Sequence, residues 1–141
     1  MKSIKLKNFE VVPVHNFLAK VELTGQASRG RSKFIKRLGE KNKEFAEDLE
    51  ELQKQYFKVD ENGSFITDSE QKLIYKDDNQ KDEAAEQMQA LNSELVEISF
   101  AEYSKKFEAM FKELDEYDKP MSNLDADAYD ILMTAYEEEN E

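Results

Sequence analysis

Hydrophobic residues recur at seven-residue intervals through the middle of the chain. Two series carry the pattern, one made of Leu38, Phe45, Leu52 and Val59 and the other of Ile35, Asn42, Leu49 and Tyr56. A repeat of this length is typical of an amphipathic helix. Turn-forming residues stand on either side, at Thr24 and Gly25 and in the sequence DENG at 60–63. We therefore predict one long helix over residues 25–59.

Asn42 is the polar member of these series, and it allows two interpretations. In the first, the hydrophobic stripe drifts around the helix and Asn42 lies at its edge. In the second, Asn42 is a buried amide that fixes the register against a partner helix. The pattern leaves both interpretations open.

Two short segments alternate hydrophobic and polar residues, as half-buried strands do. The first lies within residues 1–10, where Ile4 and Leu6 alternate with lysines, and the second covers residues 94–99 and includes Ile98. We expect these two strands to form a small antiparallel sheet.

Pairing of the two strands would bring Glu94 and Glu97 near Lys5 and Lys7. A separate β-hairpin is predicted over residues 64–76, where the strand-like sequences SFIT and KLIYK flank the turn-like DSEQ.

Four further helices are predicted from hydrophobic residues at helical spacing. They cover residues 12–21, 79–92, 100–118 and 122–138. Pro13 suits the first turn of the first of them. Ser99 and Glu102 have capping-box spacing before the third. Ser122 and Asp125 repeat that spacing before the last.

The predicted fold is α+β and mostly helical, with about five helices, one of them long and amphipathic, a small antiparallel sheet and a β-hairpin. No segment recurs at a fixed period, and no linker is long enough to divide the chain. We therefore expect a single domain over residues 1–141. A chain of this length buries roughly two thirds of its unfolded surface.

Charge is distributed unevenly along the chain. The net charge is −12 at pH 7, but residues 1–45 carry 11 Lys and Arg against 4 Asp and Glu, whereas residues 46–141 carry 9 against 28. The first part is thus +7 and the second −19. The overall acidity disfavours general nucleic-acid binding, because most of the surface would repel phosphate.

The residue types that many enzymes and metal sites use are scarce. The chain has no cysteine, which excludes disulfides and thiolate sites, and its one histidine, His15, is expected to be structural. The sequence from Asp60 departs from a calcium-binding EF-hand loop, since Ile66 and Gln71 stand where glycine and glutamate are needed. The carboxylates of DADAYD, at 125–130, point to different sides of a helix. We expect no enzymatic activity, catalytic residue, cofactor or metal.

The segment GQASRGRSKFIKR, at residues 25–37, holds five basic residues and no acidic one. It falls at the predicted start of the long helix, where the unpaired backbone amides already make cations unfavourable. One explanation is neutralisation by the protein's own acids, in the Glu-rich C-terminal tail or in EDLEEL of a neighbouring chain. The other is an external anion, which small Ala27, Ser28 and Gly30 would allow to approach the amides. The candidate partner-binding residues are Ser28, Arg29, Arg31, Lys33, Lys36 and Arg37.

The blocks LTGQASRGRSKFIKRL, DENG, VEISFAEY and DADAYDILMTAYEE follow one another in this order. Together they resemble a family of small uncharacterised proteins of Firmicutes and their phages, a domain of unknown function. The most specific part is a Gly-x-x-Ser-Arg-x-Arg run with two apolar residues after it, here Gly25, Ser28, Arg29, Arg31, Phe34 and Ile35. The resemblance implies a phage or prophage accessory protein. It implies no reaction, cofactor or catalytic residue.

The sequence favours a protein that binds another protein, either as an inhibitor of a host protein or as a component of virion assembly. The alternative is an acidic mimic of nucleic acid, whose carboxylates in residues 46–141 block a host DNA-binding or nuclease protein as an anti-defence factor. Direct nucleic-acid binding is disfavoured. We expect the cytoplasm of the bacterial host, or the virion, because no segment resembles a signal peptide or a membrane span. The oligomeric state is open.

Overall fold

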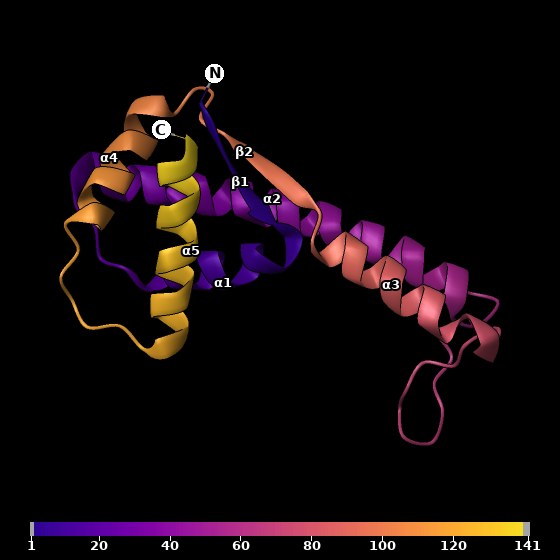
Figure 1. Cartoon of the computed structure of the whole chain (residues 1–141). Coiled ribbons are helices and arrows are strands. Elements are labelled where there is room, and N and C mark those ends of the chain that lie inside the picture. Colours follow the sequence, from indigo (N-terminus) through magenta and orange to yellow (C-terminus); the bar gives the residue numbers. More distant parts are fainter. Residues whose placement is uncertain (1, 140–141) are drawn as a thin grey trace. The chain divides into compact units, whose positions relative to one another are not determined.

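The computed structural model describes residues 2–139 of the chain (Figure 1). Within this range the fold is α+β and mostly helical, with five α-helices and a two-stranded antiparallel sheet, as predicted. The chain divides into two compact units: Met1–Asn42 with Leu95–Glu141 form the first unit, and Lys43–Glu94 form the second. The first residue of the predicted strand and the last two residues of the predicted acidic tail lie outside the described residues.

The first unit is built on the predicted sheet. β1 (Ser3–Lys7) pairs antiparallel with β2 (Leu95–Ser99), and Lys5 lies opposite Glu97. Opposite charges at paired positions favour this register by up to about 1 kcal/mol. Glu94 precedes β2, so only one of the two expected lysine–glutamate pairings forms within the sheet.

Three helices and the beginning of α2 (Gly25–Tyr56) complete the first unit. The three are α1 (Asn8–Lys20), α4 (Ser104–Asp115) and α5 (Asn123–Glu139). α1 and α5 contact each other and β1, and α4 contacts α5. The core includes aromatic rings that contact one another edge-on or stacked: Phe34, Phe100, Phe107, Phe111 and Tyr136.

α1 begins four residues earlier than predicted, at Asn8 rather than at residue 12. The Glu10 carboxylate accepts a hydrogen bond from the backbone N–H of Lys7 (2.8 Å), which closes the first turn directly after β1. Pro13 therefore lies inside the helix, where its ring nitrogen donates no hydrogen bond. Its position is exposed, so the unused carbonyl of the preceding turn can bind water.

α4 begins at Ser104 rather than at residue 100. The predicted capping box of Ser99 and Glu102 is not at the helix start, because Glu102 adopts a positive φ of 70° that interrupts the helical conformation. Ser99 Oγ instead accepts a hydrogen bond from the backbone N–H of Ala101 (3.1 Å). This turn separates buried Phe100, which belongs to the core, from the helix.

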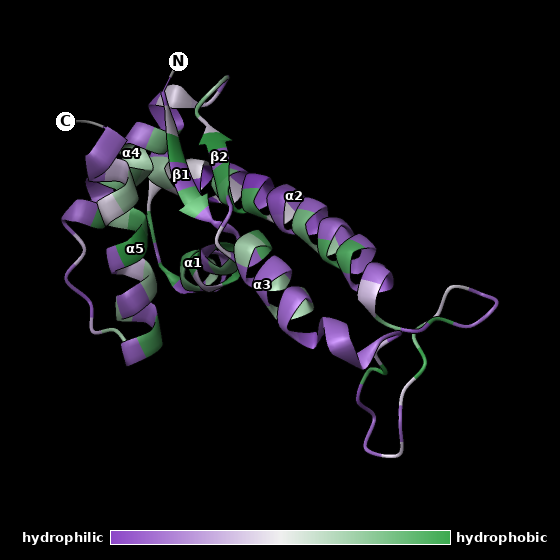
Figure 2. Ribbon diagram, turned by 45° about the vertical axis from the view of Figure 1, so that its right-hand side comes forward, coloured by the Kyte–Doolittle hydropathy of each residue, from purple (hydrophilic) through white to green (hydrophobic). Residues whose placement is uncertain are grey.

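The connection between α4 and α5 is longer than the sequence pattern indicated. α4 ends at Asp115, three residues before the predicted end at 118. α5 begins at Asn123, where the backbone N–H of Asp125 donates to Ser122 Oγ (3.2 Å), in agreement with the predicted cap. As in the other helices, hydrophobic and hydrophilic residues alternate along it (Figure 2), which is expected for a helix with one buried face.

The second unit contains the end of α2, the helix α3 (Lys81–Asn92), the short 3-10 helix η1 (Asp78–Gln80) and three extended segments. Antiparallel bridges link these segments in pairs: Phe57 with Tyr75, Val59 with Phe65, and Thr67 with Leu73. The predicted hairpin over 64–76 thus pairs with a third extended segment, the one directly after α2. For this reason α2 ends at Tyr56 and not at residue 59, since the following residues are extended.

The heptad stripe of α2 is buried to different degrees along its length. Leu38 and Tyr56 are buried, whereas Leu49 and Leu52 are half-buried. Asn42 is half-buried as well, as expected for a residue at the edge of the stripe.

Two loops of the second unit share one hydrogen-bond pattern. They begin at Asp60 and Asp68, and each aspartate carboxylate accepts from the backbone N–H groups two and four residues later, at 2.8–3.0 Å. The fourth residue of each loop has a positive φ, 81° at Gly63 and 65° at Gln71. The Asp60 carboxylate, considered above for calcium binding, therefore stabilises its own turn.

Replacing Gln71 with glycine is expected to stabilise the second unit by about 0.5 kcal/mol. A side chain at positive φ costs about 1–2 kcal/mol, and the greater freedom of glycine in the unfolded chain offsets part of the gain. The matched change Gly63→Ala should destabilise the other loop by about 1 kcal/mol. Hydrogen exchange measures both: the Lys72 amide should exchange more slowly in the first variant and the Ser64 amide faster in the second. Unchanged exchange in both would contradict the loop comparison.

Candidate functional site

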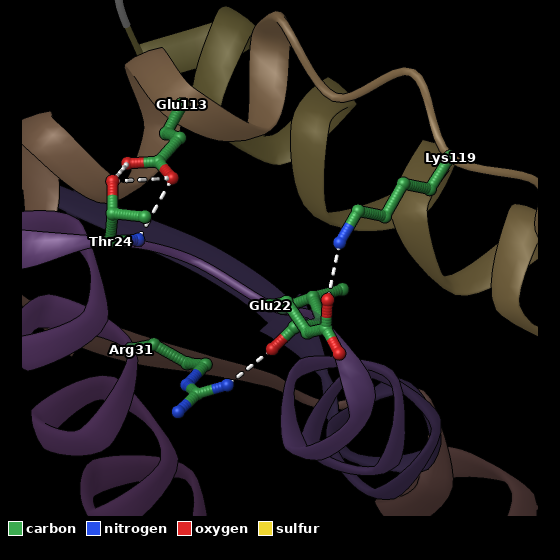
Figure 3. Close-up of polar contacts among 6 residues, drawn as sticks. Glu22, Thr24, Arg31, Glu113 and Lys119 are labelled. Atoms are coloured by element: carbon green, nitrogen blue, oxygen red, sulfur yellow. Dashed lines mark hydrogen bonds and ion pairs between the residues drawn. The ribbon is translucent and has the colours of Figure 1, made fainter.

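A carboxylate from α4 caps the start of α2, next to the basic residues. Glu113 accepts hydrogen bonds from the backbone N–H of Thr24 (2.9 Å) and from its hydroxyl (3.2 Å), as Figure 3 shows. A carboxylate at a helix N-terminus interacts favourably with the helix dipole. The protein's own acid therefore lies at this position, but it comes from neither of the two segments that the sequence suggested.

The Arg31 side chain forms a hydrogen bond within the protein. Its guanidinium donates a hydrogen bond to the backbone carbonyl of Val21, the residue directly after α1 (Figure 3). The last carbonyls of a helix lack intrahelical donors and carry partial negative charge, so a cation stabilises them. Beside it, Glu22 pairs with Lys119 on the surface, and this ion pair lowers the pKa of the Glu22 carboxyl.

Arg37 holds the turn between β2 and α4. Its guanidinium donates to the carbonyls of Ser99 (2.7 Å) and Ala101 (2.6 Å). It also lies over the rings of Tyr103 and Phe107, with its central carbon 5.0 and 5.6 Å from their centroids. Two of the six candidate residues, Arg31 and Arg37, thus serve the fold with their side chains.

The small residues of the basic segment face α4. Ala27 and Gly30 are buried. A Cβ placed on Gly30 would lie 2.7 Å from the backbone carbonyl carbon of Lys106 and closer still to its oxygen. At Gly30, therefore, the backbone of α4 occupies the space that was expected to admit an external anion.

The remaining cations of the segment lie at the surface. Arg29, Lys33 and Lys36 are exposed, and Ser28 is half-buried with its backbone N–H bonded to the Thr24 carbonyl (3.3 Å). Arg29 lines two adjoining hollows between α2 and α4, and Lys33 lines one of them. We call this feature the basic groove and define it by Gln26, Arg29, Ser32, Lys33, Tyr103 and Lys106.

Tyr103 is the aromatic centre of the basic groove. The ammonium groups of Lys33 and Lys106 lie 5.4 and 5.6 Å from the centroid of its ring. With the Arg37 guanidinium, three cations surround one half-buried ring. Cation–π attraction holds each cation near the ring, but the cations repel one another.

The groove cations have no acidic partner among residues 2–139. Other lysines of the first unit do: Lys2 pairs with Glu108, and Lys20 pairs with Asp125 at 3.2 Å. Within the described part of the chain, no ion pair involves Arg29, Lys33 or Lys106. In a protein with a net charge of −12, this groove is a local excess of positive charge.

Comparison with known families gives one match. The model of a family described as "Protein of unknown function (DUF1617)" matches residues 2–141. The chain belongs to the DUF1617 family. Searches of curated proteins and of solved structures returned no match.

The structure also places the other groups of this DUF1617 chain that the sequence raised as candidates for chemistry. His15 is half-buried, with Nδ1 3.4 Å from the side-chain oxygen of Asn16. Among the described residues, no cluster of three or more His, Asp or Glu side chains is arranged to hold a metal ion. Over the same range, no helix has the length and hydrophobicity needed to cross a membrane.

One tyrosine of the DUF1617 chain has a strongly shifted pKa. Burial, together with the hydrogen bond to Glu108, raises the pKa of Tyr136 to about 12. Tyr136 therefore stays protonated at neutral pH and donates to Glu108, which also binds Lys2. These contacts link Tyr136 of α5 to Glu108 of α4 and, through Glu108, to Lys2, the residue before β1.

The half of the groove that α4 and its preceding turn supply was not predicted from the sequence. Tyr103, Lys105 and Lys106 stand in the sequence YSKK, two adjacent lysines beside an aromatic residue in the acidic part of the chain. That local charge reversal was the available signal. Its meaning depends on Arg29 and Lys33, about 70 residues earlier, which only the fold brings alongside.

Proposed function

We propose that the DUF1617 chain acts without catalysis, by binding another protein through the basic groove. The observation that carries the proposal is the placement of Lys33 and Lys106 over Tyr103, with no acidic partner among the described residues. Tyrosine and arginine are enriched in protein interfaces, because they combine large contact area with polar groups. An acidic protein that leaves cations unpaired beside an aromatic ring has a surface suited to a negatively charged partner.

The biological setting that we propose follows from the resemblance to proteins of Firmicutes and their phages. In that setting the chain is an accessory protein in a bacterial host, where it inhibits a host protein or contributes to virion assembly. Both roles require a stable contact between proteins, and the basic groove supplies a surface for either.

Mimicry of nucleic acid has less support than protein binding. A mimic needs carboxylates that converge on one flank with few cations among them. In the second unit, lysines stand among the acids and pair with them: Lys54 with Glu50 at 3.1 Å, Lys72 with Glu70 at 3.3 Å, and Lys81 with Asp78 at 3.9 Å. We therefore retain the basic groove as the proposed binding surface.

Charge reversal in the basic groove is expected to abolish capture of the partner. The variant carries Arg29→Glu, Lys33→Glu and Lys106→Glu, and affinity purification from the bacterial host compares it with the wild type. The control carries the same charge change on exposed lysines of the second unit, through Lys58→Glu, Lys72→Glu and Lys76→Glu.

The supporting result is a specific protein captured by the wild type and the control but not by the groove variant, with circular dichroism showing that all three are folded. If the groove variant still captures the partner and the control does not, binding lies on the second unit and the proposed site is wrong. Turnover of a metabolite by the purified protein would overturn the absence of catalysis.

A further inference from the structure

We infer that the basic groove binds an acidic helix of the partner protein, with carboxylates along one face of that helix. This inference rests on the proposed function and specifies the chemistry of its partner. The observations that support it are the spacing of the cations on α2, the second cationic wall on α4, and the acidic residue that ends the row.

The exposed cations of α2 lie on one face of the helix. Arg29, Lys33 and Lys36 stand at positions i, i+4 and i+7, and all three are exposed. Their Cα atoms are separated along the helix axis by about 6 Å and about 4.5 Å. A second helix with acidic residues at the same intervals presents its carboxylates at the same separations. The row of cations on α2 and the row of carboxylates on the partner helix therefore have the same spacing.

The opposite wall of the groove adds a cation and a contact surface. The ammonium groups of Lys106 of α4 and of Lys33 of α2 both lie within 6 Å of the centroid of the Tyr103 ring. A carboxylate placed over this ring would pair with both lysines and reduce their repulsion. The ring itself would contact the aliphatic part of a glutamate side chain. A groove between two helices is also a common docking place for a helical segment.

The row of positive charge is short. Glu40 continues the same face of α2 four residues after Lys36, and it is exposed. Glu102, next to Tyr103, is also exposed, and it lines a hollow together with Tyr103 and Lys106. A nucleic-acid strand carries a phosphate at every nucleotide and would meet these acids, in addition to the repulsion of an acidic protein. A protein helix can carry carboxylates over two turns and a neutral or basic residue opposite Glu40, so we favour it over nucleic acid.

The inference can be tested with synthetic helices. Two fluorescein-labelled peptides of about 20 residues, long enough to be helical in water, have one composition and three glutamates each. In the first, the glutamates occupy positions i, i+4 and i+7 on one face, and in the second they are spread around the helix. Fluorescence anisotropy with the full chain at low salt measures binding. A single-stranded oligothymidine of similar charge is the third probe.

We expect the one-face peptide to bind at least about fivefold more tightly than the spread peptide and than the oligothymidine. Lys33→Gln and Lys106→Gln should each weaken its binding about threefold, which is the effect of losing one exposed ion pair. Lys58→Gln, in the second unit, should leave binding unchanged. Raising the salt concentration should weaken binding, because the contacts are exposed ion pairs.

Equal binding of the two peptides would overturn the inference, because the groove would then bind acidic peptides regardless of how their glutamates are spaced. Tighter binding of the oligothymidine would also overturn the inference, because the groove would then prefer nucleic acid to an acidic helix. If no peptide binds but capture still depends on the groove variant, the partner is a protein of other chemistry, and only this inference is wrong. If capture is also independent of the groove, the proposed function itself is wrong.

Discussion

Replacing Gly30 with alanine is expected to lower the free energy of unfolding by about 2 kcal/mol. The new methyl group would stand 2.7 Å from the carbonyl carbon of Lys106 and 3.3 Å from the Cβ of Met110. Two backbones meet there, so neither a rotamer change nor a flexible side-chain end can relieve the overlap. Overpacking of this kind costs about 1–3 kcal/mol or more, which exceeds the gain of up to about 1 kcal/mol from alanine's helix propensity.

The same helix offers a matched control for this substitution. Gly39 also lies in α2, but it is exposed, and a Cβ there would have no atom within 4 Å. Gly39→Ala should therefore stabilise the protein by up to about 1 kcal/mol. Urea unfolding followed by far-UV circular dichroism measures both variants, since the chain has no tryptophan to report by fluorescence. A Gly30→Ala variant as stable as Gly39→Ala would show that α2 and α4 do not approach as closely as described.

The contrast between these two glycines shows where sequence reasoning stops. In the sequence, each stands inside a helical pattern and weakens it by the same amount. The difference lies in α4, whose backbone passes Gly30 but not Gly39. That contact joins residues about 75 positions apart, and no local pattern encodes it.

The elements that could be predicted are those set by short-range periodicity. Alternation in β1 and β2 indicated both the strands and the placement of Glu97 near the lysines of β1, although not that of Glu94. The heptad repeat indicated α2. The errors lie where a tertiary contact overrides the local pattern: α2 stops at Tyr56 because the next residues pair with the loop segments, and α4 starts late because Phe100 is held in the core.

The basic segment was recognised as unusual, but the roles of its cations could not be divided from sequence. Arg31 and Arg37 donate to carbonyls at the ends of α1 and β2, which the fold brings to them from other parts of the chain. Arg29 and Lys33, two and four positions from those arginines, turn to the groove. Arg37 lies four residues after Lys33 on the same side of α2 and contacts the same Tyr103 ring, so only the carbonyls that the fold places beside Arg37 distinguish its role from that of Lys33.

Replacing Arg37 with methionine is expected to destabilise the protein by about 2 kcal/mol, whereas Lys36→Met should change stability by less than about 0.5 kcal/mol. Arg37→Met removes the two guanidinium N–H donors that bond to the carbonyls of Ser99 and Ala101. Hydrogen bonds to a charged group are worth about 1.5–3 kcal/mol. Methionine keeps much of the contact with Tyr103 and Phe107, so the loss reports mainly on the carbonyls. Lys36 is an exposed neighbour with no such contact among the described residues.

The same pair of variants separates fold from binding. Lys36→Met keeps the fold and removes the last cation of the row Arg29, Lys33 and Lys36, so the variant should bind the one-face acidic peptide more weakly and unfold at the wild-type urea concentration. Arg37→Met should shift the unfolding midpoint and speed hydrogen exchange at the Ala101 amide, which depends on the same turn. Equal stability of the two variants would mean that Arg37 does not hold the turn between β2 and α4. Tyr103 would then need another support, and the division of the basic segment into structural and exposed cations would fail at the residue on which it depends most.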